Sequence, residues 1–543
     1  MTPFLRIALV LLAVAPAPAE AARSPSQGGY STEKHVEHGI TFPRARSYKR
    51  IPTKPNEALV ILKYTEKLRE DRRSRGYHPD MLVLRIDYIP DVAPKTPGPG
   101  ESGDPDEPEE PEEPAETDEE GDTGVEEEEE KPPPPPINNF ERYLAQRGRG
   151  WTAGEASEGK ERGDWKATEY ELVRPPKSRG NLAGWAYVWE KERERTIAVL
   201  GYCPEERLEE QAKIWRNTAA KMKFSEPAPN PQRRKWERFY ARRKYVDPAY
   251  RIETRLSLPE KWKAEDTENY IVVYDTKDQP LVRKIVRDIE LIRAEYEALF
   301  PPAGPIEAVS TVRVCEDRDE YFEYGGPRGS AGYWNYRDEE LVLYDATKRE
   351  KGERTDKTDT FIVLYHEAFH QFIHYSAGEL APHSWYNEGT GDFFSGAVVK
   401  NGRVRRIGPN RWRVNTIKRA VAEGKHISWE KIIRFEQKDY YANPGLCYAQ
   451  GWSMIYFLNT SKTVASHPRW SEILTVYFEE LKRAWATEQE RLGEEGRADE
   501  KARGEAQLAA RTCAVDVAFE GVDIGELQGE WESFVRGLEA LER

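Results

Sequence analysis

Two patterns of apolar and polar positions alternate along the chain. Short runs rich in β-branched and aromatic residues, which indicate strands, occur at ALVILKY (58–64), MLVLRIDYIP (81–90), ATEYELVRP (167–175), NLAGWAYVWEKE (181–192) and RTIAVLGYCP (195–204). The segment that follows, 205–224, repeats apolar residues at helical spacing. These patterns predict an α+β domain from about 35 to 225.

A second alternation begins near Asn269. It predicts a strand at 269–275, a helix opened by Asp278-Gln279-Pro280, a strand at 309–315 and a hairpin formed by 331–336 and 340–346. A helix containing HEAFHQFIHY (366–375) follows, which we expect Thr358 or Asp359 to cap. Helical patterns dominate the rest of the chain. We therefore expect a second α+β domain at 266–543, with a small mixed sheet followed by helices.

Two segments do not fit either pattern. Residues 91–136 are acidic and rich in proline and contain no aromatic residue. Because such a segment cannot bury enough apolar surface to offset its ordering entropy, we expect a disordered insertion within the first domain. Residues 226–265 are basic and contain several prolines, and we interpret them as a connector.

The charge distribution bears on the expected partners. The formal charge is −14, but residues 101–130 alone hold 18 acidic and no basic residues, so the rest of the chain carries about +4. This nearly balanced charge gives no indication of a nucleic acid or an anionic membrane as a partner.

The amino terminus has the pattern of a secretory signal peptide. Residues 1–22 contain one basic residue, an apolar run from Ile7 to Ala15 and the small-residue segment Ala19-Glu20-Ala21. No later run approaches the about 18 apolar residues of a membrane span. We therefore expect a secreted or periplasmic protein without an integral membrane span.

Four cysteines are present, at positions 203, 315, 447 and 513, and none lies in a CxxC pair. A thiolate zinc site is therefore not expected. In an oxidising compartment disulfides are expected, and we favour a bond between Cys447 and Cys513. Cys315 lies in an apolar strand pattern and is interpreted as a buried thiol.

The histidines of HEAFH are candidate metal ligands. On a helix, His366 and His370 lie one turn apart on the same face, where both imidazoles can bind one metal ion. Glu367 lies beside that face and can reach water at the metal without replacing a histidine. The site still needs a third ligand.

The segment SWYNEGTGDFF (384–394) supplies that ligand. Glu388 would complete a site of three protein ligands with an open fourth position, which is typical of catalytic zinc. Asp392, one helical turn later, would accept the second ring N–H of His366 and fix its tautomer. Gly389, Gly391 and Gly396 are poor helix residues and count against a regular ligand helix.

The combination of HEAFH with a downstream glutamate resembles the gluzincins, the thermolysin-like zinc metallopeptidases. The matching residues are His366-Glu367-Ala368-Phe369-His370 and Trp385-Tyr386-Asn387-Glu388-Gly389, with Asp392 at the next position of the signature. The chain is more specifically similar to an uncharacterised secreted bacterial branch that carries Gln371 and YAQGW (448–452). The likeness covers roughly 265–540.

This resemblance implies hydrolysis of peptide bonds in proteins or peptides, with one zinc ion per chain. Glu367 would be the general base, and a later tyrosine would stabilise the oxyanion. Tyr448 is preferred for that role over Tyr440 and Tyr441. A strand of the hairpin would pair with an extended substrate, and the absence of a Gly-Ala-Met-Glu-Asn-like run favours an endopeptidase.

Other interpretations remain open. His374 and His383 are expected to be structural or loop residues rather than ligands. The first domain resembles the PsbP-like fold and shows no catalytic pattern. A non-proteolytic surface binding or scaffold protein is the alternative function, and a zinc hydrolase that acts on another amide, such as a cell-wall crosslink, is a third hypothesis.

Overall fold

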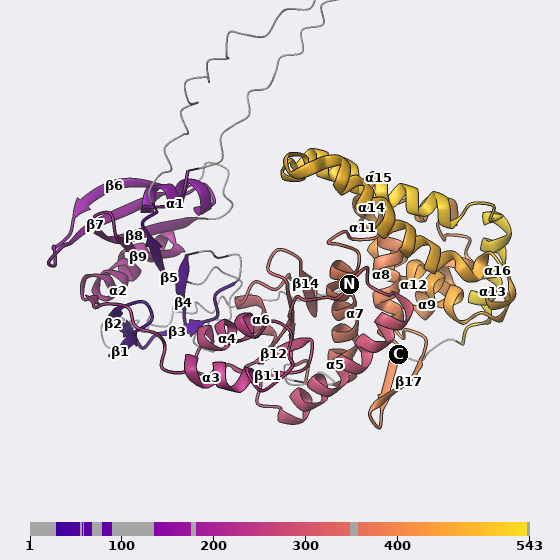
Figure 1. Cartoon of the computed structure of the whole chain (residues 1–543), viewed down its shortest axis with the longest axis horizontal. Helices are drawn as coiled ribbons and strands as arrows, with labels where there is room; N and C mark the ends of the chain where they lie inside the picture. The colour runs from indigo at the N-terminus through magenta and orange to yellow at the C-terminus, as the bar shows by residue number, and fades with distance from the viewer. Residues whose placement is uncertain are drawn as a thin grey trace, which may run out of the picture. The chain divides into compact units, whose positions relative to one another are not determined.

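The computed structural model describes residues 29–54, 57, 59–67, 79–89, 135–174, 181–347 and 357–539. These residues form a mixed α+β protein. The chain divides into two compact units (Figure 1). The N-terminal unit comprises residues up to Ile51 and Leu59–Ala228, and the C-terminal unit comprises Pro52–Ala58 and Pro229–Arg543. The predicted signal peptide and residues 91–134 of the predicted acidic insertion lie outside the described residues.

The N-terminal unit is built on an antiparallel sheet of seven strands, in the order β3-β4-β5-β9-β8-β7-β6. Strand β5 precedes the acidic segment and β9 follows it, yet the two pair along their whole length. Helix α2 covers one face of this sheet and α1 the other. The elements are β1 (Tyr30–His35), β2 (Ile40–Ala45), β3 (Tyr48–Ile51), β4 (Val60–Glu66), β5 (Asp80–Asp87), α1 (Phe140–Arg147), β6 (Thr152–Glu158), β7 (Trp165–Val173), β8 (Leu182–Lys191), β9 (Arg195–Pro204), a 3₁₀ turn (Glu205–Arg207), α2 (Leu208–Ala220) and β10 (Lys223–Phe224).

The C-terminal unit begins with a five-stranded mixed sheet of order β11-β12-β13-β15-β14. Strands β12, β13 and β15 are parallel, while β11 and β14 are antiparallel edge strands. The elements are α3 (Arg233–Tyr240), α4 (Pro248–Ser257), β11 (Lys263–Asp266), β12 (Tyr270–Tyr274), α5 (Gln279–Leu299), β13 (Ser310–Cys315), α6 (Arg318–Glu323), β14 (Gly332–Asn335), β15 (Glu340–Tyr344) and α7 (Lys357–Ser376). Residues 226–265, which we interpreted as a connector, thus contain α3, α4 and the start of β11, and from Pro229 onward they belong to this unit.

Helices α5 and α7 pack on one face of this sheet, and α4 and α6 pack on the other. The start of α5 follows the sequence prediction, because Pro280 lies in the first turn and the Asp278 carboxylate accepts a hydrogen bond from the backbone N–H of Leu281 at 3.0 Å. Thr358 and Asp359, predicted as caps, instead lie within the first turn of α7.

Most of the chain after α7 is helical, but a two-stranded hairpin that the sequence patterns did not predict interrupts it. The elements are α8 (Ser384–Phe394), β16 (Ala397–Lys400), β17 (Arg403–Ile407), α9 (Val414–Ala422), α10 (Trp429–Ile432), α11 (Gln437–Ala442), α12 (Pro444–Thr460), α13 (Lys462–Ser466), a 3₁₀ turn (Trp470–Glu472), α14 (Ile473–Ala498), α15 (Glu500–Ala518) and α16 (Ile524–Gly537). Figure 1 shows these helices gathered on one side of the sheet of their own unit.

The predicted disulfide is wrong, because all four cysteines are free. Cys447 is buried in α12, while the Cys513 thiol of α15 donates to a carboxylate oxygen of Glu480 at 3.3 Å. The interpretation of Cys315 as a buried strand thiol is confirmed.

Helix α8 is regular despite its glycines, and close packing explains their presence. A Cβ atom at Gly389 would lie 2.6 Å from the carbonyl oxygen of Gly451 in α12, and one at Gly391 would lie 2.9 Å from Nδ1 of His366. The expectation of an irregular helix is therefore wrong. Glycine lets α8 approach both α12 and the histidine-bearing helix α7.

We predict that Gly389→Ala lowers the free energy of unfolding by about 1–3 kcal/mol, because the added methyl group forces backbone apart at the α8–α12 contact. The matched control is Gly529→Ala in α16, where a Cβ meets no atom within 4 Å and should stabilise the helix by about 0.5–1 kcal/mol. Chemical denaturation measures both values. Equal stability of the two variants would contradict the packing account.

Candidate metal centre

The centre is built by two consecutive helices. Helix α7 provides His366, Glu367 and His370, and α8 provides Glu388. Helix α7 is fixed by α5 and by strands β14 and β15, while α8 packs between α7 and α12. The side chains of the centre are thus presented by rigid helices and not by a loop.

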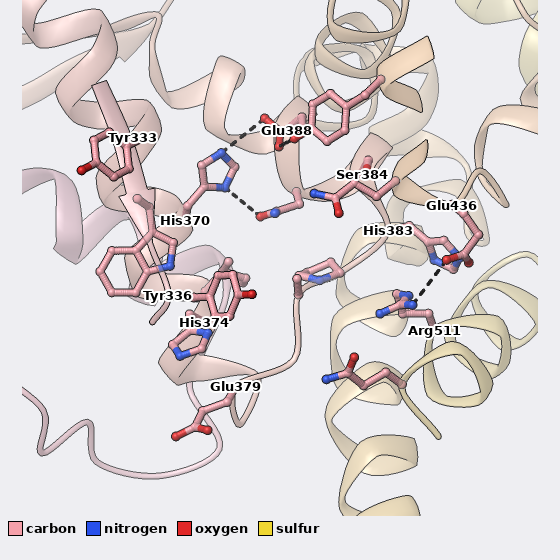
Figure 2. Close-up of a pocket in the computed structure, with 18 of the residues that line it drawn as sticks. Tyr333, Tyr336, His370, His374, Glu379, His383, Ser384, Glu388, Glu436 and Arg511 are labelled. Atoms are coloured by element: carbon pink, nitrogen blue, oxygen red, sulfur yellow. Dashed lines mark hydrogen bonds and ion pairs between the residues drawn. The ribbon is translucent and has the colours of Figure 1, made fainter. Parts of the chain in front are cut away.

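Three ligand atoms converge at this point. The Nε2 atoms of His366 and His370 lie 3.0 Å apart, and Oε2 of Glu388 lies 3.2 Å from the first and 3.3 Å from the second. Figure 2 shows the His370 ring directed toward Glu388. Tetrahedral zinc with bonds of about 2.05 Å needs ligand atoms about 3.3 Å apart. The two imidazoles and one carboxylate therefore fit a zinc ion in both chemistry and spacing.

The second nitrogen of each histidine ring is also bound. Nδ1 of His366 lies 3.3 Å from Oδ1 of Asp392, as the sequence predicted, and Nδ1 of His370 lies 3.0 Å from Oδ1 of Asn387. An acceptor at Nδ1 fixes the tautomer that leaves Nε2 free to bind a metal. The role of Asn387 was not predicted, because it depends on a contact with a histidine 17 positions earlier in the chain.

The charged groups of the centre strongly shift one another's pKa values. Burial opposes a charge on His366, but hydrogen bonds with Asp392 and Glu388 outweigh it and raise the pKa of the imidazole to about 10. Burial likewise opposes a charge on His370, whose pKa Glu388 raises. Burial disfavours an ionised Glu388 as well, yet the charge of His370 and hydrogen bonds from both histidines hold its pKa well below the usual range. A metal ion must therefore displace protons to bind.

Glu367 lies beside the ligand atoms but outside their cluster. Its Oε2 accepts a hydrogen bond of 2.9 Å from the backbone N–H of Trp334 on strand β14. Glu367 lines the same cavity as His366 and His370. The edge strand therefore orients one carboxylate oxygen of Glu367 while the group faces the cavity.

The three candidate tyrosines are placed differently. The Tyr441 hydroxyl donates to Oε1 of Glu388 at 2.6 Å, and the Tyr448 hydroxyl donates to that of Tyr441 at 3.4 Å. The Tyr448 ring lies nearly parallel to that of His366, with the ring centres 6.4 Å apart. Tyr440 is fully buried and donates to the carbonyl of Cys447. Tyr441 and Tyr448 therefore belong to the site, whereas Tyr440 does not.

A cavity of about 810 Å³ surrounds the centre. Its walls come from strand β14, helix α7, the start of α8, the residues around the start of α11, and helix α15. Figure 2 shows Tyr333, Tyr336 and His374 on the side of the sheet, with Glu436 and Arg511 on the opposite side. The α15 wall was not apparent in the sequence, because it lies more than 100 positions after the motif.

His374 and His383 line this cavity but do not belong to the ligand cluster. The His374 ring packs against Trp334, and burial lowers the pKa of His374. His383 hydrogen-bonds with the Tyr477 hydroxyl at 3.1 Å, and burial together with nearby arginines lowers its pKa to about 3. Both imidazoles are therefore neutral near pH 7.

The comparisons with known proteins leave the chain without a family. No family model and no curated protein matches it. Among solved structures, the solution structure of PsbP (CyanoP) from the cyanobacterium Synechocystis is similar, with 10% identity over 38% of this chain and 100% of that chain, at a TM-score of 0.23. A likeness at that TM-score does not establish a shared fold. In the part of the chain that the structure describes, no helix is long and apolar enough to cross a membrane.

We predict that zinc added to the metal-free protein near pH 7 releases protons. The pKa of His366 is about 10, so displacement of its proton should lower the affinity about tenfold for each pH unit below 10. The raised pKa of His370 adds to this dependence. Calorimetric titration in two buffers of different ionisation enthalpy detects the release. Identical heats in the two buffers would contradict this electrostatic description.

Proposed function

We propose that the protein is a zinc metallopeptidase of the gluzincin type, and that it cleaves peptide bonds within proteins or peptides. One observation carries the proposal: Nε2 of His366, Nε2 of His370 and Oε2 of Glu388 converge at 3.0–3.3 Å, in a cavity that Glu367 also lines. The mixed sheet with an antiparallel edge strand, followed by two ligand helices and further helices, supports a thermolysin-like catalytic domain.

The residues of the site have distinct roles in this proposal. His366, His370 and Glu388 hold zinc, which when bound supplies a Lewis acid that activates water and polarises the scissile carbonyl. Glu367 accepts the proton of the attacking water and passes it to the leaving amine. The Trp334 N–H occupies one oxygen of Glu367 and leaves the other for this transfer.

Strand β14 is the proposed docking site for the substrate. It is the edge of the sheet, and the Trp334 N–H points away from β15 to reach Glu367. The backbone groups of Gly332, two residues earlier, point to the same side of the strand, although Gly332 is buried. A Cβ at Gly332 would lie 2.5 Å from Cγ1 of Val363, so glycine allows this edge to lie against α7. An extended peptide would add as a further strand beside the zinc ligands.

Tyr448 and Tyr441 have separate roles in the proposal. The Tyr441 hydroxyl donates to Oε1 of Glu388, so Oε2 would be the carboxylate oxygen that holds the metal ion. Tyr448 lies against His366 and lines the cavity, where its hydroxyl can donate to the developing oxyanion. Cleavage would occur outside the cytoplasm, as the amino-terminal sequence predicts.

The first experiment is Glu367→Gln. We predict that zinc binding is unchanged, because Glu367 is not in the ligand cluster, and that turnover of unfolded casein or a peptide library falls by about 10²-fold or more. Glu379→Gln is the matched control, since the same change in the same cavity lies away from the ligands. Unchanged turnover in Glu367→Gln would refute the mechanism. A zinc-bound wild type that cleaves no peptide would favour the binding or scaffold protein.

A second experiment distinguishes the role of Tyr441 from that of Tyr448. Tyr441→Phe removes the hydrogen bond to Glu388 and should lower zinc affinity by about tenfold. Tyr448→Phe should instead lower kcat by about 10²-fold or more, and should lower zinc affinity less than Tyr441→Phe, because Tyr448 makes only a long hydrogen bond of 3.4 Å to the Tyr441 hydroxyl. Chelator competition and steady-state kinetics measure the two effects. If Tyr441→Phe lowered kcat and Tyr448→Phe lowered zinc affinity, the proposed roles would be wrong and Tyr441 would be the oxyanion donor.

A further inference from the structure

The loop between β17 and α9 contacts the carboxylate behind His366. Nε of Arg413 donates to Oδ2 of Asp392 at 2.6 Å, and Nδ2 of Asn410 donates to Oδ1 at 3.2 Å. The same Asn410 amide also donates to the backbone carbonyl of Asp392 at 3.1 Å. These donors come from residues about 20 positions after Asp392, so the sequence gives no local indication of them.

Asp392 is only 2% exposed. A buried carboxylate is costly unless it is paired and its oxygens accept hydrogen bonds. Arg413 supplies the charge and two donors, Nε to Oδ2 and Nη2 to Oδ1 at 3.4 Å, and Asn410 supplies a further donor to Oδ1. Oδ1 is also the oxygen that contacts Nδ1 of His366. Burial opposes the charge of Arg413, but the charge of Asp392 and the hydrogen bond to it outweigh burial and raise the pKa of the guanidinium above its ordinary value. The carboxylate is thus held in one orientation toward the histidine.

Arg413 contacts a second residue of the site. Its guanidinium carbon lies 4.8 Å from the centre of the Tyr448 ring, and that ring lies nearly parallel to the His366 imidazole. One side chain therefore touches both the carboxylate that orients a zinc ligand and the proposed oxyanion donor. Arg413 itself does not line the cavity.

We propose that Arg413 is a positioning residue for the metal centre. It fixes Asp392, and through Asp392 the ring of His366, while its cation–π contact holds the Tyr448 ring. This inference rests on the proposed zinc hydrolase function. It predicts that Arg413 affects zinc affinity only through Asp392, and affects turnover without a direct contact to the substrate.

A double-mutant cycle tests the link. Zinc affinity is measured by competition with a chromophoric chelator for the wild type, Arg413→Met, Asp392→Asn and the double variant. We expect Arg413→Met to lower affinity by about tenfold or more, and to have no further effect once Asp392 is replaced. Additive losses would overturn the proposal, because they would show that Arg413 acts independently of Asp392.

Arg411→Met is the matched control. It makes the same change two residues away, where the guanidinium pairs with Asp359 instead of Asp392, and zinc affinity should be unchanged. Arg413→Lys keeps the charge with fewer donors, so it should recover part of the affinity. It also keeps the test valid if Arg413→Met does not fold. A loss in Arg411→Met equal to that in Arg413→Met would overturn the proposal.

Kinetics supply an independent readout. Arg413→Met should lower kcat and leave KM unchanged, because Arg413 lies behind the reacting groups and not in the cavity. A rise in KM alone would contradict a positioning role. A wild type that binds no zinc would refute the proposed function together with this inference, whereas a zinc-bound, active wild type with additive losses would refute only this inference.

Discussion

The candidate metal centre depends on the close approach of three helices. Two imidazoles and a carboxylate can meet within 3.3 Å only if α8 lies directly against α7, and Gly391 permits this because any Cβ there would meet the His366 ring. On its other side α8 lies against the backbone of α12 at Gly389. The glycines, which are unfavourable in an isolated helix, are therefore required by the packing that brings Glu388 to the histidines.

The same packing creates an electrostatic constraint. Glu388 and Asp392 are carboxylates buried beside two imidazoles, and such groups need compensating charge. Without a metal, protons on the histidines supply it: burial lowers the pKa of His366 and of His370, but the neighbouring carboxylates outweigh burial and raise both pKa values. A divalent cation bound by the two imidazoles and Glu388 would supply this positive charge in place of the protons. An arrangement that serves only packing would gain more from apolar residues of similar volume, so the cluster favours a binding role.

Local patterns predicted the ligand set but not the surroundings of the site. Helical spacing placed His366 and His370 on one face, and the second motif supplied Glu388 and Asp392. Asn387 and Tyr441 acquire their roles from contacts 17 and 53 positions apart in the chain, which spacing alone does not reveal. The β16–β17 hairpin and the helices of 229–265 were missed for a related reason, since their short, polar sequences become ordered through tertiary contacts. The predicted Cys447–Cys513 disulfide is wrong because an even number of cysteines and an oxidising compartment do not determine which thiols lie close together.

The metal content of the purified mature protein tests the central claim most directly. Mass spectrometry on the wild type and on Glu388→Ala, both checked for folding by circular dichroism, distinguishes a metal centre from buried polar packing. The account predicts about one zinc per wild-type chain and a sharp loss in the variant, because Glu388 supplies one of three protein ligands. A folded wild type that takes up no zinc, even when zinc is supplied, would contradict it.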